Sequence, residues 1–264
     1  MFAKGLRRLP VAEVFKEYAR YYDLLYKDKD YVGEIAYIQN FIKKYNPSAK
    51  TVLNLGCGTG RHDACLQKMG YEVTGIDLSD TMLVEAKKRA IPGKLEFFQG
   101  DVRTVSLKKK FDVVVSLFHV MSYQTADADI SAAFKTAAKH LKKGGIFIFD
   151  FWNGDGVLKD LPTVRVKRLK DDVMKIVRIA EPVIHRKRKV IDVNYQIIAL
   201  NKKSGQYSEF YETHFMRYFF LPEIEQALSK TGFSLEHAGA WMSDNPISSA
   251  WYGLVLARRI VADE

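Results

Sequence analysis

Several features that define specialised protein classes are scarce or missing in this sequence. Its 264 residues include only two cysteines, Cys57 and Cys65, too few for a disulfide framework and without the spacing of a metal site. We therefore expect reduced thiols, a cytoplasmic protein and no bound metal. No apolar run approaches the roughly 18 residues that a membrane-spanning helix needs. The basic N-terminus, residues 1–10, is not followed by the apolar segment of a signal peptide, so we expect no membrane association.

Acidic residues are also fewer than basic ones. Lys and Arg number 41 against 31 Asp and Glu, which gives a formal net charge of +10. Most of this excess lies in residues 161–218, which hold 13 basic and 6 acidic residues. Such a basic surface favours nucleic acid, phospholipid headgroups or a phosphorylated small molecule. Lysine-rich strand edges that resist aggregation would give the same composition, and the sequence leaves both interpretations open.

Apolar periodicity predicts alternating strands and helices over most of the chain. Two helices are expected first, over residues 11–27 and 31–45. Strands are then expected at 51–55, 71–76, 95–98, 111–117 and 145–151, with helices at 61–69, 80–90 and 128–142. This alternation predicts an α/β fold, in which helices cover both faces of a parallel sheet.

The pattern changes after residue 154. Period-two segments rich in β-branched and aromatic residues predict an antiparallel sheet inserted over residues 161–220. Pro222 then opens a helix, and strands near 233–240 and 251–258 complete the main sheet. We therefore divide the chain into N-terminal helices that form a lid (1–47), a cofactor-binding α/β domain (48–154 and 221–264), and an antiparallel insertion on the acceptor side that also offers a homodimer contact (155–220).

The most informative motif is a run of alternate glycines after the first strand of the expected sheet. Gly56, Gly58 and Gly60 follow the apolar residues 51–55 and precede a helix. Because glycine has no Cβ, a ligand can lie against the backbone there, and the helix N-terminus offers free N–H groups. Asp77 ends the next strand, where a carboxylate can accept the hydroxyls of a ribose. Together these residues predict a cofactor that contains adenosine.

The spacing of the loop distinguishes between two such cofactors. A dinucleotide-binding loop carries a third glycine that packs its helix on the strand, and Arg61 occupies that position here. The more compact pattern, preceded by Asn54 and Leu55, favours S-adenosylmethionine. Asp101 ends the third strand, at the same sheet edge, where its carboxylate can accept from the exocyclic amine of adenine.

These elements, followed by the fourth strand, resemble the class I S-adenosylmethionine-dependent methyltransferases over roughly residues 50–152. The resemblance implies a Rossmann-like, doubly wound, seven-stranded sheet, with S-adenosyl-L-methionine as cofactor and S-adenosyl-L-homocysteine as product. It implies cofactor binding by Tyr26, Asn54, Gly56, Gly58, Gly60, Asp77, Leu78, Met82, Asp101, Val102, Ser116 and Leu117. Methyltransferases that act on exocyclic base amines carry an Asp/Asn/Ser-Pro-Pro-aromatic motif at the fourth strand. Residues 116–119 (Ser-Leu-Phe-His) lack both prolines, which argues against nucleic acid as the acceptor.

A closer resemblance is to the nucleotide-linked amino-sugar N,N-dimethyltransferases of deoxysugar biosynthesis. It rests on the tyrosine-rich residues 22–31, on residues 115–118 followed by Tyr123, on residues 144–152, and on the antiparallel insertion. The resemblance implies that Tyr26 reaches the active site and that Tyr123 lies just after the fourth strand. Three positions depart from the family pattern: Asn54 replaces an aspartate, Asp77 a glutamate, and His119 a small residue.

Methyl transfer to an amine requires alignment of the reacting atoms and an exit for a proton. His119 and Tyr123 are the catalytic residues we predict, because both follow the fourth strand on the loop that should face the methyl group. A histidine titrates near neutral pH and can take that proton. A loop histidine bonded to backbone and a tyrosine that only packs against the ligands are the alternatives. His214, on an insertion strand, is expected to be structural.

The acceptor side is expected to be aromatic and basic. Tyr22, Tyr26, Trp152 and Arg178 are the substrate-binding residues we predict, with Trp152 stacking on a sugar, a base or a cationic amine. If the acceptor carries a pyrophosphate, the cations that could pair with it are Arg165, Lys167, Arg178, Arg186 and Arg188.

The function predicted from these residues is methylation of a small molecule, with an amino group on a nucleotide-linked deoxysugar as the acceptor. Two alternatives remain. One is a methyltransferase for another small O-, carboxyl or amine acceptor. The other, from a different class, is a cofactor-binding regulator or RNA-binding protein that uses the basic insertion.

Overall fold

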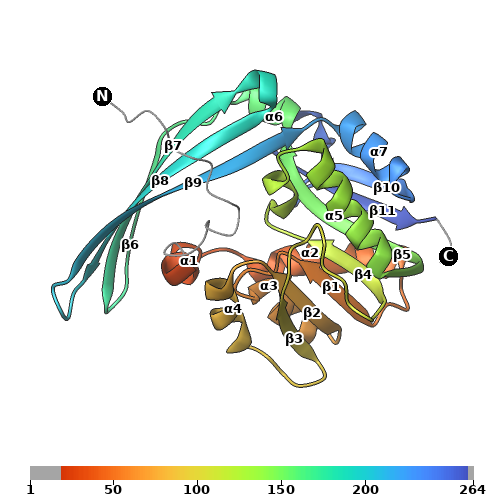
Figure 1. Ribbon diagram of the computed structural model, residues 1–264, viewed down its shortest axis with the longest axis horizontal. Helices are drawn as coiled ribbons and strands as arrows, with labels where there is room; N and C mark the ends of the chain where they lie inside the picture. The colour runs from red at the N-terminus through yellow and green to blue at the C-terminus, as the bar shows by residue number, and fades with distance from the viewer. Residues whose placement is uncertain (1–18, 261–264) are drawn as a thin grey trace.

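A computed structural model describes residues 19–260 of the chain. Figure 1 shows an α/β part, from which a long antiparallel sheet arches away over helix α1. Only the C-terminal part of the helix predicted over residues 11–27 is described, as α1 (Ala19–Leu25). Residues 11–18 of that prediction lie outside the described residues. None of the described helices is long and apolar enough to cross a membrane.

The α/β part is built on a seven-stranded sheet in the order β3-β2-β1-β4-β5-β11-β10. Its strands are β1 (Thr51–Leu55), β2 (Glu72–Asp77), β3 (Leu95–Gln99), β4 (Phe111–Ser116), β5 (Leu141–Asn153), β10 (Phe233–Ala240) and β11 (Tyr252–Arg259). The first five are parallel, and β11 runs antiparallel to both β5 and β10. The strand order reverses between β1 and β4, and ligands bind such sheets at the carboxyl ends of the strands beside this reversal. The predicted doubly wound, seven-stranded sheet is confirmed.

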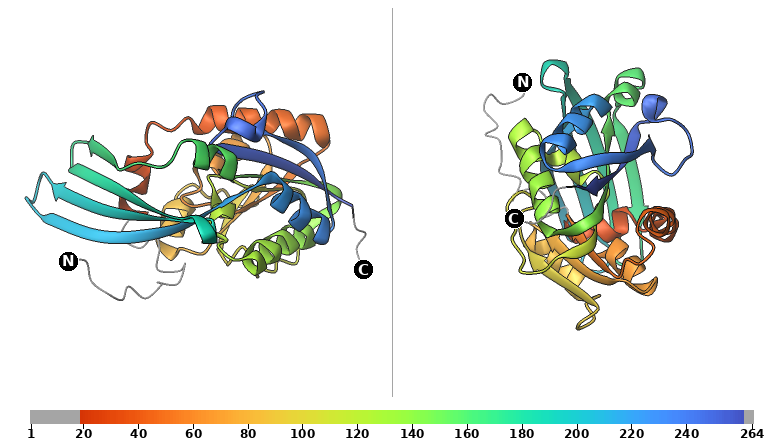
Figure 2. Two further views of the ribbon diagram at one scale, coloured as in Figure 1. Left: turned by 90° about the horizontal axis from the view of Figure 1, so that it is seen from above. Right: turned by 90° about the vertical axis from the view of Figure 1, so that its right-hand side faces the viewer.

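Helices cover both faces of this sheet, because successive residues of its buried strands point to opposite sides. In β5, Ile146 and Ile148 pack with the helices α2 and α3, whereas Phe147 and Phe149 pack with α5 and α7. In the view from above in Figure 2, α2 and α5 lie on opposite sides of the strands. The helix bounds are α2 (Tyr31–Tyr45), α3 (Arg61–Lys68), α4 (Asp80–Lys87), α5 (Asp127–His140) and α7 (Leu221–Lys230).

Side-chain caps start two of these helices. The Asp30 carboxylate accepts the Gly33 N–H at the start of α2, at 2.8 Å. The Ser79 hydroxyl accepts the Met82 N–H at the start of α4, at 3.3 Å. Such caps satisfy N–H groups that have no partner within the helix. Both lie directly beside the segments that line the cavity described below.

The insertion is a four-stranded antiparallel sheet, as predicted. Its strands are β6 (Arg165–Lys170), β7 (Met174–His185), β8 (Val190–Asn201) and β9 (Tyr207–Phe219). β9 also pairs with the end of β5, through Trp152 with Tyr218 and Asn153 with Phe219. The insertion is therefore a continuation of the main sheet beyond the carboxyl end of β5. Its concave face is directed toward the carboxyl ends of the parallel strands.

Several element boundaries differ from the sequence prediction, and one helix was not predicted. The helix predicted to run to residue 142 ends at His140, and β5 begins directly at Leu141. β4 ends at Ser116, because Phe118 and His119, the second and third residues beyond it, adopt a left-handed backbone. A short helix, α6 (Gly154–Lys159), was not predicted. It approaches the backbone of residue 250 so closely that a Cβ on Gly156 would lie 2.2 Å from a carbonyl oxygen.

Helix α1 bridges the two sheets. Leu25 packs against Ile176 and Ile197 of the antiparallel sheet. On its other side, the Asp23 carboxylate accepts from the Thr59 hydroxyl and the Arg89 guanidinium, each at 2.7 Å. The α1 contacts thus connect the glycine loop to the insertion. The division into lid, cofactor domain and acceptor insertion stays a prediction.

Candidate cofactor and acceptor site

A cavity of about 430 Å³ lies between the carboxyl ends of the parallel strands and the concave face of the antiparallel sheet. The α/β side is formed by the loops after β1, β2, β3 and β4, and the opposite side by β7, β8 and β9. Tyr22 of α1 and Tyr26, directly after α1, add a third side. The cavity is large enough for a small-molecule site.

The glycine loop forms the floor of this cavity. Gly56, Gly58 and Gly60 all have positive φ, at 88°, 56° and 74°, a conformation that other residues rarely adopt. A Cβ on Gly56 would lie 2.5 Å from the Val120 side chain. A side chain at this position would therefore collide with the loop after β4. Gly56 and Gly58 line the cavity, so a ligand can approach their backbone directly.

Asp77 also lines the cavity and holds the loop in shape. Its carboxylate accepts the N–H of Gly58 at 2.7 Å and that of Ser79 at 2.9 Å. Burial raises the pKa of this carboxyl group above its usual value. A carboxylate offers about four lone-pair positions, so acceptor capacity remains for a ligand hydroxyl.

Asp101 lines the cavity as predicted, but its carboxylate is already paired. Arg103 donates to it through Nε at 2.9 Å and through Nη2 at 2.6 Å, and also binds Asp129 at 2.9 Å. Partial burial raises the pKa of Asp101, but the Arg103 hydrogen bonds outweigh it and the pKa is lowered. An adenine amine would thus meet an acceptor that shares its lone pairs with Arg103.

Three of the predicted cofactor residues lie outside the cavity lining, each with a structural partner. Asn54 is buried, and its Nδ2 donates to Asp63 Oδ2 at 2.9 Å. Burial raises the pKa of Asp63 to about 7. The Ser116 hydroxyl donates to the Leu55 carbonyl at 2.7 Å. Gly60 packs so closely that a Cβ would lie 2.6 Å from the Phe97 ring.

The remaining cofactor residues of the prediction do reach the cavity. Those that line it are Tyr26, Gly56, Gly58, Asp77, Leu78, Met82, Asp101, Val102 and Leu117. Arg61 and Thr59, which the sequence analysis did not assign, lie there too. Cofactor binding by all of these residues stays a prediction.

His119 lies in a strained turn at the end of β4. Both it and Phe118 have a φ of 67°, and left-handed backbone at such residues is unfavourable by about 1–3 kcal/mol each. Asp150 stabilises the turn: its two oxygens accept the His119 N–H at 3.1 Å, and Oδ2 lies 2.7 Å from Nδ1 of the ring. The ring stacks on Tyr252, with centroids 4.4 Å apart. His119 lines the cavity, with its orientation set by Asp150 and Tyr252.

Tyr123 belongs to a polar chain that the sequence did not reveal. Its hydroxyl lies 2.8 Å from Nδ1 of His214, and Nε2 of His214 lies 3.3 Å from a Glu212 carboxylate oxygen. Burial raises the pKa of Tyr123 and lowers that of His214. Tyr123 and His214 both line the cavity, although a structural role was expected for His214. The available signal was the spacing of 212 and 214, which puts both side chains on one face of a strand.

The predicted substrate residues come together on the acceptor side. Tyr22, Tyr26, Trp152 and Arg178 all line the cavity. Arg178 donates to the Tyr26 hydroxyl at 3.2 Å and lies over the Tyr195 ring, 5.2 Å from its centroid. Substrate binding by these four residues stays a prediction.

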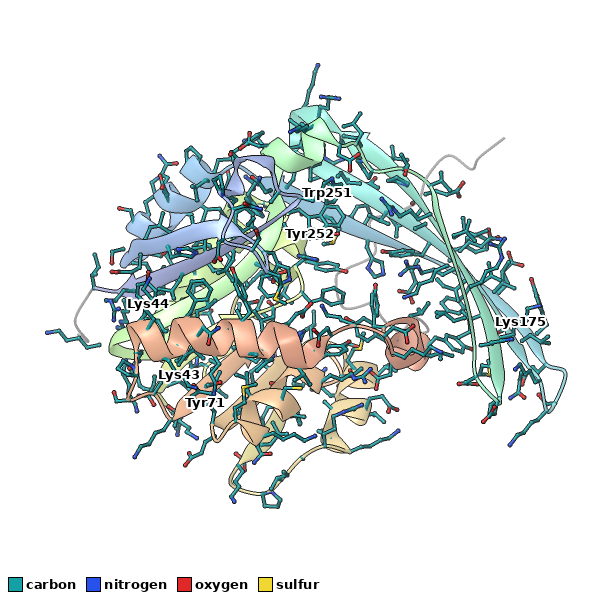
Figure 3. All side chains as sticks on the ribbon, turned by 180° about the vertical axis from the view of Figure 1, so that it is seen from behind. Lys43, Lys44, Tyr71, Lys175, Trp251 and Tyr252 are labelled. Atoms are coloured by element: carbon teal, nitrogen blue, oxygen red, sulfur yellow. The ribbon has the colours of Figure 1, made fainter. Side chains whose placement is uncertain are left out.

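Several aromatic residues of the acceptor side were not predicted, among them Tyr195, Trp251 and Tyr252. Figure 3 shows Trp251 and Tyr252 at the junction between the main sheet and the insertion. Both line the cavity, and Trp251 packs against Trp152 with ring centroids 5.1 Å apart.

The other cations proposed for a pyrophosphate divide into two groups. Arg165 joins Arg178 in the cavity lining, whereas Lys167 donates to the Leu25 carbonyl and lies outside it. Arg186 and Arg188 lie in the exposed hairpin between β7 and β8, also outside the cavity lining. Within residues 19–260 there is no group of three or more side chains that could hold a metal ion.

Comparison with known proteins agrees with this geometry. Residues 52–145 match the family described as methyltransferase domain. A relative from Streptomyces venezuelae, named dTDP-3-amino-3,4,6-trideoxy-alpha-D-glucopyranose N,N-dimethyltransferase, is 28% identical over 223 residues, covering 84% of this chain and 92% of the relative. The match therefore extends well beyond the methyltransferase domain.

Solved structures give the same result for the fold. The crystal structure of DesVI from Streptomyces venezuelae has a TM-score of 0.76 at 26% identity, covering 91% of this chain and 97% of the other. The structure of SAM-bound CalS10, described as an amino pentose methyltransferase from Micromonospora echinaspora, has a TM-score of 0.73 at 23% identity, covering 97% and 100%. The resemblance to class I S-adenosylmethionine-dependent methyltransferases, and to amino-sugar N,N-dimethyltransferases, is confirmed.

Proposed function

We propose that this chain is an S-adenosylmethionine-dependent methyltransferase that methylates an amino group on a nucleotide-linked deoxysugar. The observation that carries the proposal is a single cavity with two chemically different sides. A glycine loop and acidic residues form one side, and arginines and aromatic rings from the insertion form the other. The similarity to the S. venezuelae dimethyltransferase spans most of both chains and supports the same acceptor class.

The α/β side fits S-adenosylmethionine. The glycines leave room where a Cβ would stand, and Asp77 retains acceptor capacity for the ribose hydroxyls. When bound there, the cofactor would supply an activated methyl group on a sulfonium, so the protein mainly has to align the acceptor and exclude water. Met82, Val102 and Leu117 contribute apolar surface to this side.

The insertion side fits an anionic, sugar-containing acceptor. Arg165 and Arg178 supply positive charge in the cavity lining, opposite Asp77 and Asp101. Guanidinium groups bind phosphates through paired hydrogen bonds. Trp152 and the aromatic residues around it offer flat surfaces on which a sugar or base can pack.

An acceptor amine must be neutral when it attacks the methyl group. His119 and Tyr123 are the two groups we propose near the reacting amine. Nδ1 of His119 lies 2.7 Å from a carboxylate oxygen of Asp150, which fixes the orientation of the ring. Tyr123 faces His214 and has a hydroxyl oxygen that can accept from the amine. We propose that Tyr123 takes the proton from the amine and that His119 orients the amino sugar.

The direct test is a methylation assay with dTDP-linked 3-amino and 4-amino deoxysugars, read by mass spectrometry. We expect mono- or dimethylated products, and none from the corresponding hydroxy sugars. If only hydroxyls or carboxylates react, another small acceptor is the substrate. If no small acceptor reacts and the protein binds RNA in a salt-sensitive manner, the regulator alternative replaces the enzyme.

A pair of variants tests the acceptor side. Arg178→Met removes a charge from the cavity and should raise KM for the nucleotide sugar about tenfold, since a hydrogen bond to a charged group contributes about 1.5–3 kcal/mol. Affinity for S-adenosylhomocysteine should not change. Arg188→Met, in the exposed hairpin, is the matched control and should leave both values unchanged.

A further inference from the structure

We infer that His214 and Glu212 form a proton relay that leads from Tyr123, in the cavity lining, to Glu212, outside that lining. The three side chains are in series: Tyr123 Oη to His214 Nδ1 at 2.8 Å, and His214 Nε2 to Glu212 Oε2 at 3.3 Å. Tyr123 and His214 line the cavity, whereas Glu212 does not. The inference rests on the proposed function, because it concerns the proton that an acceptor amine must lose.

The direction of each hydrogen bond in the series Tyr123–His214–Glu212 follows from Glu212. A carboxylate only accepts, so the proton of a neutral His214 lies on Nε2 and points to Glu212. Nδ1 then accepts, and the Tyr123 hydroxyl donates to it. A hydroxyl can accept as well as donate, so Tyr123 Oη can accept the N–H of an ammonium in the cavity. His214 is buried, with 2% of its surface exposed, and burial lowers its pKa, which favours the neutral ring that this arrangement needs.

The step balances without any further reactant. The acceptor ammonium gives one proton to Tyr123 Oη, while Tyr123 passes its own proton to His214 Nδ1. His214 releases the proton of Nε2 to Glu212. The result is a neutral amine, an unchanged tyrosine, a histidine in its other tautomer and a protonated Glu212. The 9% exposure of the Glu212 side chain allows exchange with solvent to restore the starting state.

The groups around the relay are compatible with it. Arg178 of β7 lies near enough to lower the pKa of His214, and Tyr195 of β8 packs edge-on to the imidazole, with ring centroids 4.8 Å apart. Burial raises the pKa of Tyr123, and Tyr195 and Tyr26, which directly follows α1, act in the same direction. Tyr123 therefore stays protonated at neutral pH, and it can pass a proton along the chain only if His214 takes one at the same time.

The decisive variant is Glu212→Gln. The amide oxygen of glutamine can still accept a hydrogen bond from His214 Nε2. It cannot take up the proton, because an amide is not protonated near neutral pH. With a dTDP-linked amino sugar, we expect kcat at pH 7 to fall about 100-fold, the lower end of the usual range for acid–base catalysis. The deficit should shrink as the pH rises and the amine loses its proton in solution. Glu209→Gln, on the same strand with an exposed side chain, is the matched control and should behave as the wild type.

Tyr123→Phe provides an independent test, with the same pH dependence expected. Residues that act as a unit are not additive, so the Tyr123→Phe/Glu212→Gln double variant should be no slower than the slower single variant. A deficit that is equal at all pH values, or no deficit at all, would overturn the relay while leaving the methyltransferase intact. A wild type that binds S-adenosylhomocysteine but methylates no amine would overturn the relay together with the amine acceptor.

Discussion

Replacing Asp77 with alanine should weaken binding of S-adenosylhomocysteine by about 100-fold. The Asp77 carboxylate lies at the carboxyl end of β2, in the cavity lining, and accepts the N–H groups of Gly58 and Ser79 at 2.7 and 2.9 Å. Its carboxylate oxygens can accept further hydrogen bonds, and we expect the ribose hydroxyls to supply them. Alanine would remove the proposed contacts to the ribose and leave the Gly58 and Ser79 N–H groups without this acceptor.

The magnitude follows from these contacts. Each hydrogen bond from a ribose hydroxyl to a charged group contributes about 1.5–3 kcal/mol. Two such bonds at the low end of that range amount to about 3 kcal/mol, which corresponds to roughly a hundredfold in Kd. Asp77→Asn should have a smaller effect, because the amide keeps one acceptor oxygen. Its NH₂ group, however, would face the Gly58 or Ser79 N–H.

Isothermal titration calorimetry of the wild type, Asp77→Asn and Asp77→Ala measures these affinities directly. Glu225→Ala, on the exposed side of α7, is a control of the same charge change away from the cavity. Thermal melts of each variant without ligand separate loss of binding from loss of folding. The assignment of Asp77 to the ribose is refuted if Asp77→Ala binds within threefold of the wild type. The cofactor assignment fails if the wild type does not bind at all.

Two further predictions concern the support of the loop. Burial raises the pKa of Asp63 from 3.8 to about 7, so its contribution to stability is fully present below pH 3.8 and is lost as pH rises through about 7. Asp63→Asn keeps a polar partner for Asn54. In urea unfolding, its free energy of unfolding should rise by about 4 kcal/mol relative to that of the wild type between pH 4 and pH 8.5. If the difference in unfolding free energy between variant and wild type is the same at both pH values, the assignment is contradicted. Asp23→Asn weakens the contacts of α1 with Thr59 and Arg89, each at 2.7 Å. We expect faster dissociation of S-adenosylhomocysteine in stopped-flow measurements, and an unchanged rate would show that α1 does not retain the ligand.

The parts of this protein that its sequence determined are those that depend on local spacing. The period of the apolar residues indicated the parallel α/β sheet and the change to antiparallel strands after residue 154, because burial of one face or two leaves different patterns. Gly56, Gly58 and Asp77 were predictable for a similar reason. They end consecutive parallel strands, and such ends lie at one edge of a sheet whatever the rest of the chain does.

Pairings between distant elements required the tertiary structure. Tyr123 and His214 are 91 residues apart and meet only because β9 joins the end of β5, which turns the concave face of the insertion toward the loop after β4. The role of Asp150 in the turn at His119 depends in the same way on the register of β4 against β5.

Asn54 illustrates the limit of a motif. Its place beside the glycine loop predicted contact with the cofactor, whereas its side chain turns to the buried Asp63. A one-residue step along a strand reverses the face to which a side chain points, and the packing of α3 on β1 decides what lies on that face. The sequence thus predicted which residues of the α/β side line the cavity, because that side is built from consecutive strand ends. The tertiary fold decided which residues line the opposite side, because that side is assembled from strands far apart in the chain.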